Sequence, residues 1–335
     1  MSFVTVVIPA YNVEQYIEEC LRSVLAQTYR DFEVLVINDG STDRTADKVK
    51  KFTDRRVRLI NQLNRGLAGA RNTGARRACG DYVAFLDSDD RWHPEKLQHH
   101  VDHLNKNPQV GVSYSQSAFI DADGKPMGYS QRPKLKGITA RDVFLRNPVG
   151  NGSAPVLRAQ VLIDIAHMRA GVLSLEEAYF DESFRQSEDI ECWMRIALTT
   201  DWKFEGIGLP LTEYRVNEGG LSAALDKQLA SWERVVAKSR TYANEFVQEN
   251  VDAARAYQYR YLARRAVRSN DPVRALSLIG KSLQSYPGIV IEEPGRTLAT
   301  LGAAVLRGLI PSTGYARLEA LAMQVANGVR SRPAV

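Results

Sequence analysis

A tight run of carboxylates follows an apolar stretch in the first third of the chain. Asp87-Ser88-Asp89-Asp90 comes directly after residues 82–86, whose length and composition predict a buried strand. Carboxylate oxygens are hard ligands for Mg²⁺ or Mn²⁺, and such ions commonly bind through one or two carboxylates together with substrate phosphates. The run therefore predicts a divalent-metal site that also holds a diphosphate. The alternative is an acidic turn that caps a helix beginning near Pro94.

Short apolar runs alternate with amphipathic stretches in this part of the chain, which predicts strands followed by helices. Strands are expected at residues 4–8, 33–37, 57–60, 82–86 and 110–114. Helices are expected around residues 17–25, 46–52, 66–78 and 94–105. Because parallel neighbouring strands require crossover connections, this order predicts a mainly parallel sheet with helices on both faces. One edge of the sheet should then collect the polar residues at 9–12, 38–41 and 87–90.

The second half of the chain has a different pattern. From residue 116 it loosens into loops that contain glycine and proline, with a helix expected at 158–167. We expect these loops to shape the acceptor side of a site. After Ser222 the chain is predicted to be largely helical.

Composition excludes several classes of protein. A hydrophobic fraction of 44% and a charged fraction of 25% are those of a soluble globular protein. Three distant cysteines without metal-like spacing argue against a disulfide framework or a zinc site and favour a reducing cytosol. We expect no signal peptide, because the apolar run from residue 3 is too short, and no membrane span, because residues 298–310 are broken by Arg307. A net charge of +5 does not choose between nucleic acid, an anionic membrane surface and a phosphorylated substrate.

Four motifs, in this order and spacing, resemble the family 2 inverting glycosyltransferases of the GT-A fold. They are Val6-Val7-Ile8-Pro9-Ala10-Tyr11-Asn12, then Asn38-Asp39-Gly40-Ser41-Thr42-Asp43, then the glycine-rich segment from Asn64 to Gly74, then the acidic run. The resemblance covers residues 3–222. It implies a Rossmann-like, mixed and mainly parallel sheet with helices on both faces. The expected division is a nucleotide-sugar-binding and catalytic domain at 1–222 and a helical region at 223–335.

The resemblance implies a nucleotide pocket around the first three motifs. Pro9 and Tyr11 would line the base pocket, and Asp39 would accept a hydrogen bond from the base, typically uracil, whose imide offers an N–H donor. Asn64 and Arg71 would lie near the ribose or the diphosphate, where a guanidinium complements phosphate. The alternative for Arg71 is a solvated helix face.

The two acidic motifs receive separate roles by the same resemblance. Asp87 and Ser88 would contact the ribose and nearby groups, while Asp89 would coordinate a metal ion, Mn²⁺ or Mg²⁺, that joins the two phosphates. Ser187-Glu188-Asp189 resembles the family's general-base motif, and inversion by direct displacement needs one carboxylate to take the acceptor's proton. Asp189 is the candidate and Glu188 is its rival. A purely structural carboxylate at a helix N-terminus is the third interpretation.

The sequence departs from the family at two places. Asn38 stands where relatives commonly have aspartate, which weakens the assignment of the base, and Asn217 stands where several relatives have histidine, which is a better ligand for softer metals. Arg215 and Ser222 are expected to approach the phosphates. His93, His99, His100 and His103 lie in or beside one predicted helix without a metalloprotease acid motif, and we expect them to be surface residues.

These observations predict an inverting, metal-dependent glycosyltransferase that moves a hexosyl or N-acetylhexosaminyl group from a UDP-sugar to an acceptor hydroxyl. The expected acceptor is a glycan, a polysaccharide or a lipid-linked sugar, in polysaccharide, glycan or glycolipid synthesis. The alternative is a non-catalytic nucleotide-sugar-binding or scaffold protein of the same fold.

The helical region is expected to serve oligomerisation, acceptor contact or contact with a membrane surface. Residues 298–306 are largely apolar and are flanked by Arg296 and Arg307. The arginines of this region lack interleaved aromatics except Tyr257, Tyr259 and Tyr261, so nucleic acid is not an expected partner. The expected location is cytoplasmic, at the inner face of the membrane.

Overall fold

The computed structural model describes residues 2–171, 175–217 and 225–310. Ser222 and the predicted domain boundary at 222/223 therefore lie outside the described residues. The chain divides into two compact units, Met1–Asn244 and Glu245–Val335, which are described separately here. The functional division at residue 222 stays a prediction.

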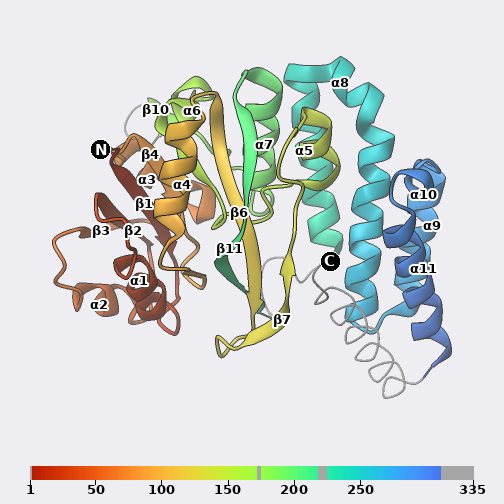
Figure 1. Ribbon diagram of the computed structural model, residues 1–335, viewed down its shortest axis with the longest axis horizontal. Coiled ribbons are helices and arrows are strands. Elements are labelled where there is room, and N and C mark those ends of the chain that lie inside the picture. The colour runs from red at the N-terminus through yellow and green to blue at the C-terminus, as the bar shows by residue number, and fades with distance from the viewer. Residues whose placement is uncertain (1, 172–174, 218–224, 311–335) are drawn as a thin grey trace, which may run out of the picture. The chain divides into compact units, whose positions relative to one another are not determined.

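The first unit is built on a mixed, mainly parallel sheet (Figure 1), as expected. Its strand order among the described residues is β3-β2-β1-β4-β8-β6-β11-β5, with β7 paired to β6. The parallel half comprises β1 (Val4–Ala10), β2 (Phe32–Asp39), β3 (Val57–Gln62) and β4 (Tyr82–Phe85). The other half comprises β5 (Arg91–Trp92), β6 (Val110–Ile120), β7 (Pro126–Gln131), β8 (Val156–Arg158) and β11 (Lys203–Arg215).

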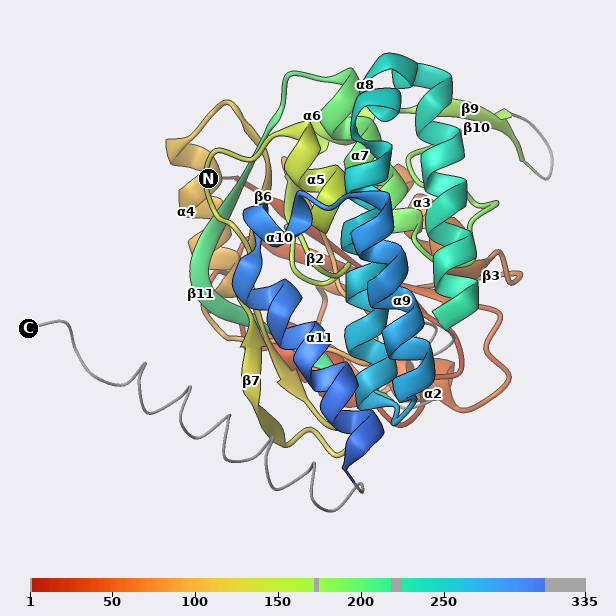
Figure 2. The same cartoon turned by 90° about the vertical axis from the view of Figure 1, so that its right-hand side faces the viewer.

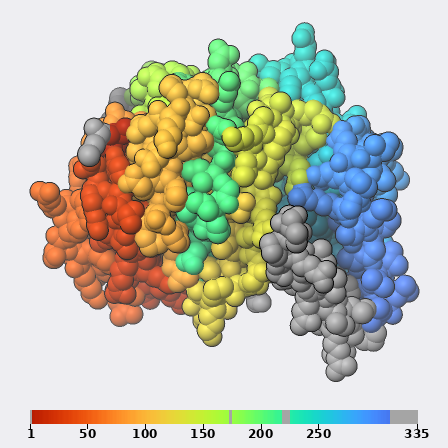
Figure 3. Space-filling view, in the orientation of Figure 1, coloured from red at the N-terminus to blue at the C-terminus, as the bar shows by residue number. Residues whose placement is uncertain are grey.

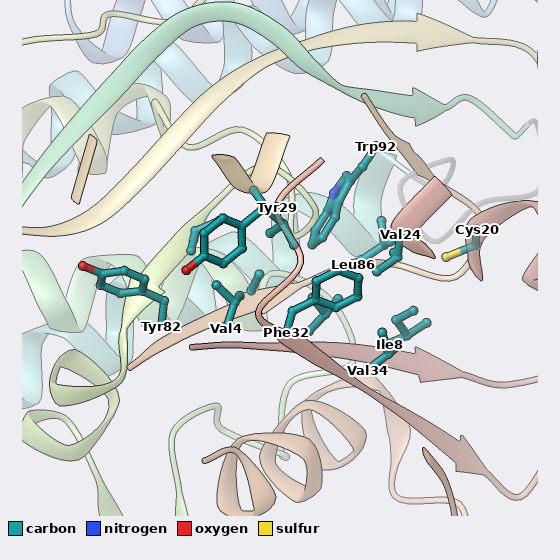
Figure 4. Packing of buried hydrophobic residues seen from close by; sticks show 14 of the residues in the cluster. Val4, Ile8, Cys20, Val24, Tyr29, Phe32, Val34, Tyr82, Leu86 and Trp92 are labelled. Atoms are coloured by element: carbon teal, nitrogen blue, oxygen red, sulfur yellow. The ribbon is translucent and has the colours of Figure 1, made fainter. Parts of the chain in front are cut away.

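Helices connect the parallel strands and cover both faces of the sheet. They are α1 (Ile17–Leu25), α2 (Thr45–Lys50), α3 (Gly66–Arg77) and α4 (Lys96–Lys106). Side chains of a strand alternate between the two faces, so Val4, Val6 and Ile8 of β1 share one face, where they join the core that includes α1 and α4. Figure 4 shows this packing around Val4 and Ile8. Val7 points to the opposite face, where α3 lies.

Two elements of the first unit differ from the expectation. The helix expected at 158–167 is the short α6 (Ala159–Asp164), after which the chain forms the hairpin β9 (His167–Ala170) and β10 (Leu175–Ala178). β8 also inserts antiparallel between β4 and β6, which the regular alternation of strand and helix does not indicate. A three-residue strand is too short to leave a periodic signal, so its position depends on pairing with its neighbours.

The surface prediction for the four histidines is wrong for His100. His100 is buried and its Nε2 lies 3.3 Å from Nζ of Lys96, which is itself buried and donates to the carbonyl of Ala154 at 2.7 Å. Burial lowers the pKa of both groups well below their ordinary values. A second contact, of 2.7 Å, joins His100 Nδ1 to Ser113 Oγ, so this polar network fastens α4 to the sheet. Residues of α4 and β11 adjoin on the face seen in Figure 3.

The remaining helices of the first unit are α5 (Ala140–Arg146), α7 (Glu188–Thr199) and the first part of α8 (Leu225–Arg268). Trp232 of α8 stacks on Phe144 of α5 with 6.1 Å between ring centroids. Ala243 has non-helical backbone angles, directly before the division between the units. α8 is therefore two helices, and the first of them belongs to the first unit.

The second unit contains the rest of α8, α9 (Pro272–Ser285), α10 (Ile289–Glu292) and α11 (Pro294–Leu309). α9 and α11 lie side by side (Figure 2). The expectation of a C-terminal helical region is confirmed. Within the part of the chain that the structure describes, no helix is both long and apolar enough to cross a membrane.

The close approach of α3 to β1 makes a stability prediction. A Cβ on Gly74 would lie 2.2 Å from Cγ1 of Val7, so Gly74→Ala should destabilise the protein by about 1–3 kcal/mol through overpacking. Gly280→Ala in α9 is the matched control, because nothing lies within 4 Å of its added methyl and the substitution should be neutral or stabilising. Thermal unfolding of both variants measures this. If Val7→Ala costs as much stability in the Gly74→Ala background as in the unsubstituted protein, the steric explanation is wrong.

Candidate functional site

The carboxyl ends of β1, β2 and β4 meet at one edge of the sheet, because the three strands are parallel neighbours. The loops that follow β1 and β2 are tied together by hydrogen bonds. Asn12 N–H donates to Ser41 Oγ at 3.1 Å, and Thr42 N–H donates to Asn12 Oδ1 at 2.8 Å. Asn12 and Gly40 both have positive φ, so these turns are tight. Two of the three polar clusters expected at this edge are therefore in direct contact.

Asp39 is buried at the end of β2 and organises the next loop. Its carboxylate accepts hydrogen bonds from Gln62 Nε2 at 2.6 Å and from the backbone N–H groups of Arg65 and Gly66, each at 2.8 Å. Asp39 thus holds the entry to α3, a structural function that the sequence did not reveal. Asn64, one residue before these donors, is exposed.

The two residues assigned to the base pocket differ in exposure. Pro9 is buried within β1, opposite Ile37 of β2. Tyr11 is 51% exposed just beyond the strand. A nucleotide base at this edge could therefore contact the Tyr11 ring directly, whereas Pro9 shapes the strand end beneath it.

Arg71 lies at the centre of the site. It projects from α3, is 2% exposed, and donates to Oδ1 of Asp87 and to Oε1 of Glu188, in both cases at 2.6 Å. The solvated helix face considered for Arg71 is therefore wrong. Burial favours the neutral form, but the charges of Asp87 and Glu188 outweigh it and raise the pKa of Arg71 above its ordinary value. A Cβ on Gly152 would come 2.2 Å from Nη2 of Arg71, so only glycine fits beside this ion pair.

The members of the acidic run have different partners. Asp90 is buried and accepts hydrogen bonds from Ser153 Oγ at 2.6 Å and from the Arg215 N–H at 2.8 Å. Ser153 Oγ in turn accepts from the Asp87 N–H at 3.0 Å. Asp90 and Ser153 therefore fix the course of the acidic run, in which Ser88 is also buried.

Asp89 differs from Asp87, whose carboxylate is bound to the Arg71 guanidinium, because its own carboxylate is held by a neutral amide. The amide of Asn217 donates to it at 3.0 Å. Burial, and then the charge of Asp87, raise the pKa of Asp89 to about 6. Hard carboxylate oxygens of this kind fit Mg²⁺ or Mn²⁺. Among the described residues no three His, Cys, Asp or Glu side chains are grouped to hold an ion alone, so substrate phosphates would have to complete the coordination.

The guanidinium of Arg215 forms hydrogen bonds within the protein at all three of its nitrogen atoms. Its Nε donates to the Asp89 carbonyl at 2.7 Å, and its Nη2 donates to Glu19 of α1 at the same distance. Nη1 donates to the carbonyls of Asp121 and Ala122. Arg215 therefore holds the acidic run in place through its contacts with Asp89 and Asp90.

The second acidic motif opens α7. Ser187 has φ of 63°, a left-handed conformation that turns the chain sharply into the helix. Glu188 is buried and bonded to Arg71, whereas Asp189 is partly buried and accepts only a local hydrogen bond, from the Ile190 N–H at 2.8 Å. Burial, and then the charge of Glu188, raise the pKa of Asp189 to about 7, although Arg71 opposes the shift. Between the two rivals, Asp189 is the better placed to accept a proton.

Several contributors were missed by the sequence analysis. Gly152 and Ser153 lie in the part of the chain after residue 116 that was predicted only as loops. Arg65 was missed as well: its guanidinium donates to Glu176 of β10 at 2.8 Å and to Glu182 at 2.9 Å. The glycines were the available signal, since a glycine between two turns often marks a close approach.

The ion pairs of Arg71 generate a prediction. Arg71→Leu would leave the buried Glu188 and the half-buried Asp87 without a cation, so it should cost about 3–5 kcal/mol of stability. Arg22→Leu is the control, because its pair with Glu18 is 72% exposed on the arginine side and should contribute under about 1 kcal/mol. Denaturant unfolding measures both. A loss at Arg71 no larger than that at Arg22 would contradict this account.

Comparison with known proteins supports one family throughout. A model of "Glycosyl transferase family 2" matches residues 5–165. An Escherichia coli protein, UDP-Glc:alpha-D-GlcNAc-diphosphoundecaprenol beta-1,3-glucosyltransferase WfaP, is 33% identical over 230 residues, which cover 68% of this chain and 83% of that protein. The E. coli enzyme of the same description named WfgD is 30% identical over 227 residues, covering 68% and 82%.

Solved structures agree on the fold. The S. aureus TarS 1–349 structure in complex with UDP superimposes with a TM-score of 0.58 at 20% identity, covering 91% of this chain and 87% of that one. The mannosyltransferase PcManGT from Pyrobaculum calidifontis, in complex with GDP-Man and Mn²⁺, gives 0.57 at 20% identity, covering 92% and 87%. With the sheet order, the acidic run and the matched relatives taken together, the chain belongs to glycosyltransferase family 2 and is a glycosyltransferase of the GT-A type.

Proposed function

We propose that this chain transfers a sugar from a UDP-sugar to an acceptor hydroxyl with inversion, with a divalent metal ion bound at Asp89. The observation that carries the proposal is the division of labour around Arg71. Arg71 neutralises Asp87 and Glu188, while Asp89 and Asp189 keep carboxylates that no cation of the described chain holds by a hydrogen bond. One such carboxylate suits a metal and the other suits a base.

The donor is proposed to lie over the joined ends of β1 and β2. Tyr11 and Pro9 would border the base, and Asp39 would hold the turn that carries Asn64 beside it. The fixed loop at Asp87 and Ser88 would then meet the ribose. The two E. coli relatives are named for UDP-Glc, and a TarS structure was solved in complex with UDP-GlcNAc, which supports a hexosyl or N-acetylhexosaminyl group on UDP.

Asp89 would hold the metal ion beside the diphosphate of the donor. When bound, Mg²⁺ or Mn²⁺ supplies Lewis-acid stabilisation of the charge that develops on the departing diphosphate. The surrounding residues of the chain position Asp89. Arg215 anchors its carbonyl and Asn217 orients its carboxylate. Mn²⁺ in the PcManGT complex supports a divalent ion here.

Asp189 is proposed to be the general base. A β bond made from an α-linked UDP-sugar requires inversion, and a single displacement needs one base on the acceptor side. Asp189 would take the proton of the acceptor hydroxyl as the oxygen attacks the anomeric carbon and the bond to the diphosphate breaks. Arg71 fixes the adjacent Glu188 and so orients the start of α7.

The acceptor is proposed to be a lipid-linked sugar at the inner, cytoplasmic face of a membrane. Two relatives of about 30% identity are named for GlcNAc-diphosphoundecaprenol acceptors. Residues beyond the catalytic domain would contribute acceptor contact or self-association. This assignment gives the transferase a water-soluble donor and a membrane-bound acceptor.

Substitution of Asp189 tests the proposed base. Asp189→Asn should lower turnover by roughly 10²–10⁴-fold, because the acceptor proton loses its recipient, while the affinity for UDP in Mn²⁺ changes little. UDP release from a panel of UDP-sugars and calorimetric UDP binding, each with Mn²⁺, Mg²⁺ or EDTA, measure the two quantities. Asp201→Asn is the control, since Asp201 is exposed just after α7. No release from any donor would favour the non-catalytic alternative, and an equal loss of UDP affinity would remove Asp189 from the role.

The proposed base also predicts how turnover depends on pH. With a pKa of about 7, Asp189 loses its proton as pH rises through 7, so turnover should rise across this range and then level off. The groups that face it are Glu188 on its own helix, Arg71 from α3 and Asp87 from the acidic run. The pH profile of turnover measures the rise. A profile that is flat between pH 6 and 8 would contradict the assignment.

The same pKa has a consequence for stability. Because the folded protein keeps the Asp189 proton above the ordinary pKa of 3.8, stability should fall as pH rises from about 4 to 7. Asp189→Asn removes this effect. The stability of the variant relative to the unsubstituted protein should therefore be higher at pH 8 than at pH 4. Melting temperatures at the two pH values provide the comparison.

A further inference from the structure

α11 buries polar residues and exposes apolar ones, the reverse of a helix that packs through its apolar residues. Its buried face carries Thr297 and Thr300, each only 2% exposed. Its outward face carries Leu298 at 58% and Leu309 at 77% exposed, with the partly exposed Leu306 between them. A helix at the surface of a soluble protein normally has the reverse arrangement.

The inner face of α11 packs without help from the leucines. Thr297 Oγ1 donates to the Glu293 carbonyl at 2.8 Å and accepts from Nη1 of Arg260 at the same distance. Thr300 Oγ1 donates to the Arg296 carbonyl at 2.7 Å. The buried hydroxyls are thus satisfied, Ala304 is buried with them, and α11 contacts α9. The outward leucines contribute little to holding this unit together.

The outward residues form one continuous stripe. Leu298, Gly302, Val305, Leu306 and Leu309 are all exposed and recur at helical spacing. α11 has no acidic residue, and its two charged residues, Arg296 and Arg307, stand toward its two ends. An apolar stripe flanked by arginines is the pattern of a helix that lies in the interface of an anionic bilayer.

We infer that the outward face of α11 adsorbs to an anionic lipid surface, with the helix lying in the membrane plane. This inference deepens the proposed use of a lipid-linked acceptor and relies on that function for its purpose. The leucines and Val305 would enter the acyl boundary, and the arginines would meet phosphate headgroups. The protein would then work at the surface where its acceptor is embedded.

A second copy of the chain fits this face less well. Stable protein interfaces bury roughly 800 Å² on each partner, and the exposed parts of four aliphatic side chains fall well short of that area. Two-fold pairing of α11 with itself would also bring Arg296 of each copy toward Arg307 of the other, and like charges oppose association. A bilayer needs no such area and gains from both arginines.

The test is co-sedimentation of the full chain, without donor or acceptor, with vesicles of phosphatidylcholine alone or mixed with phosphatidylglycerol. The test variant is Leu306→Asp with Leu309→Asp. The control is Val273→Asp with Ile291→Asp, which changes two residues of the same unit that are 79% and 85% exposed but lie outside α11. Circular dichroism confirms that both variants are folded.

The unsubstituted chain and the control should bind the anionic vesicles, less at high salt, and the α11 variant should bind at least about tenfold more weakly. Equal binding of the α11 variant, or no binding of the unsubstituted chain, overturns the inference. A dimer in light scattering that the α11 variant dissociates, without vesicle binding, assigns the face to a second copy instead. UDP release with a water-soluble acceptor is measured separately, so a failure of the proposed transfer reaction is distinguishable from a failure of membrane binding.

Discussion

A buried guanidinium holds the site together. Arg71 joins three elements: its own helix α3, the acidic run after β4 through Asp87, and the start of the sequence-distant α7 through Glu188. Charges in such a place require compensation, because burial removes the water that would otherwise solvate them. The two carboxylates compensate the arginine, and the arginine in turn allows two acidic motifs to approach each other. Gly152 leaves the room for this contact.

The same contact divides the carboxylates into fixed and available ones. Asp87 and Glu188 are bound to the cation, and Asp90 is bound to Ser153 and the chain of β11. The pKa values of Asp89 and Asp189 are raised, since each is partly desolvated beside a like charge. A metal ion and an acceptor proton are the positive partners that such carboxylates favour. The geometry therefore concentrates unsatisfied negative charge at two places in the site.

The two units use buried polar groups in a common way. In the first unit Lys96 and His100 fasten α4 to the sheet through hydrogen bonds, and in the second Thr297 and Arg260 fasten α11 to its neighbours. When a helix packs against its neighbours through polar residues, its apolar residues can remain on the solvent-exposed face. For α11 the result is an outward apolar stripe, and this stripe gives the helical unit a surface suited to lipid.

The family, the mainly parallel sheet and the helical C-terminal region could all be predicted from the amino-acid sequence, because periodicity and motif order are properties of the sequence. Which carboxylates are neutralised could be seen only in the folded chain, since Glu188, one of the two partners of Arg71, lies 117 residues away in the sequence. The tertiary structure also decided that His100 is buried and that β8 enters the sheet, where strand pairing and burial override local spacing. The proposed roles of Asp89 and Asp189 rest on such contacts: the motifs name the candidate residues, and the fold gives each carboxylate different partners.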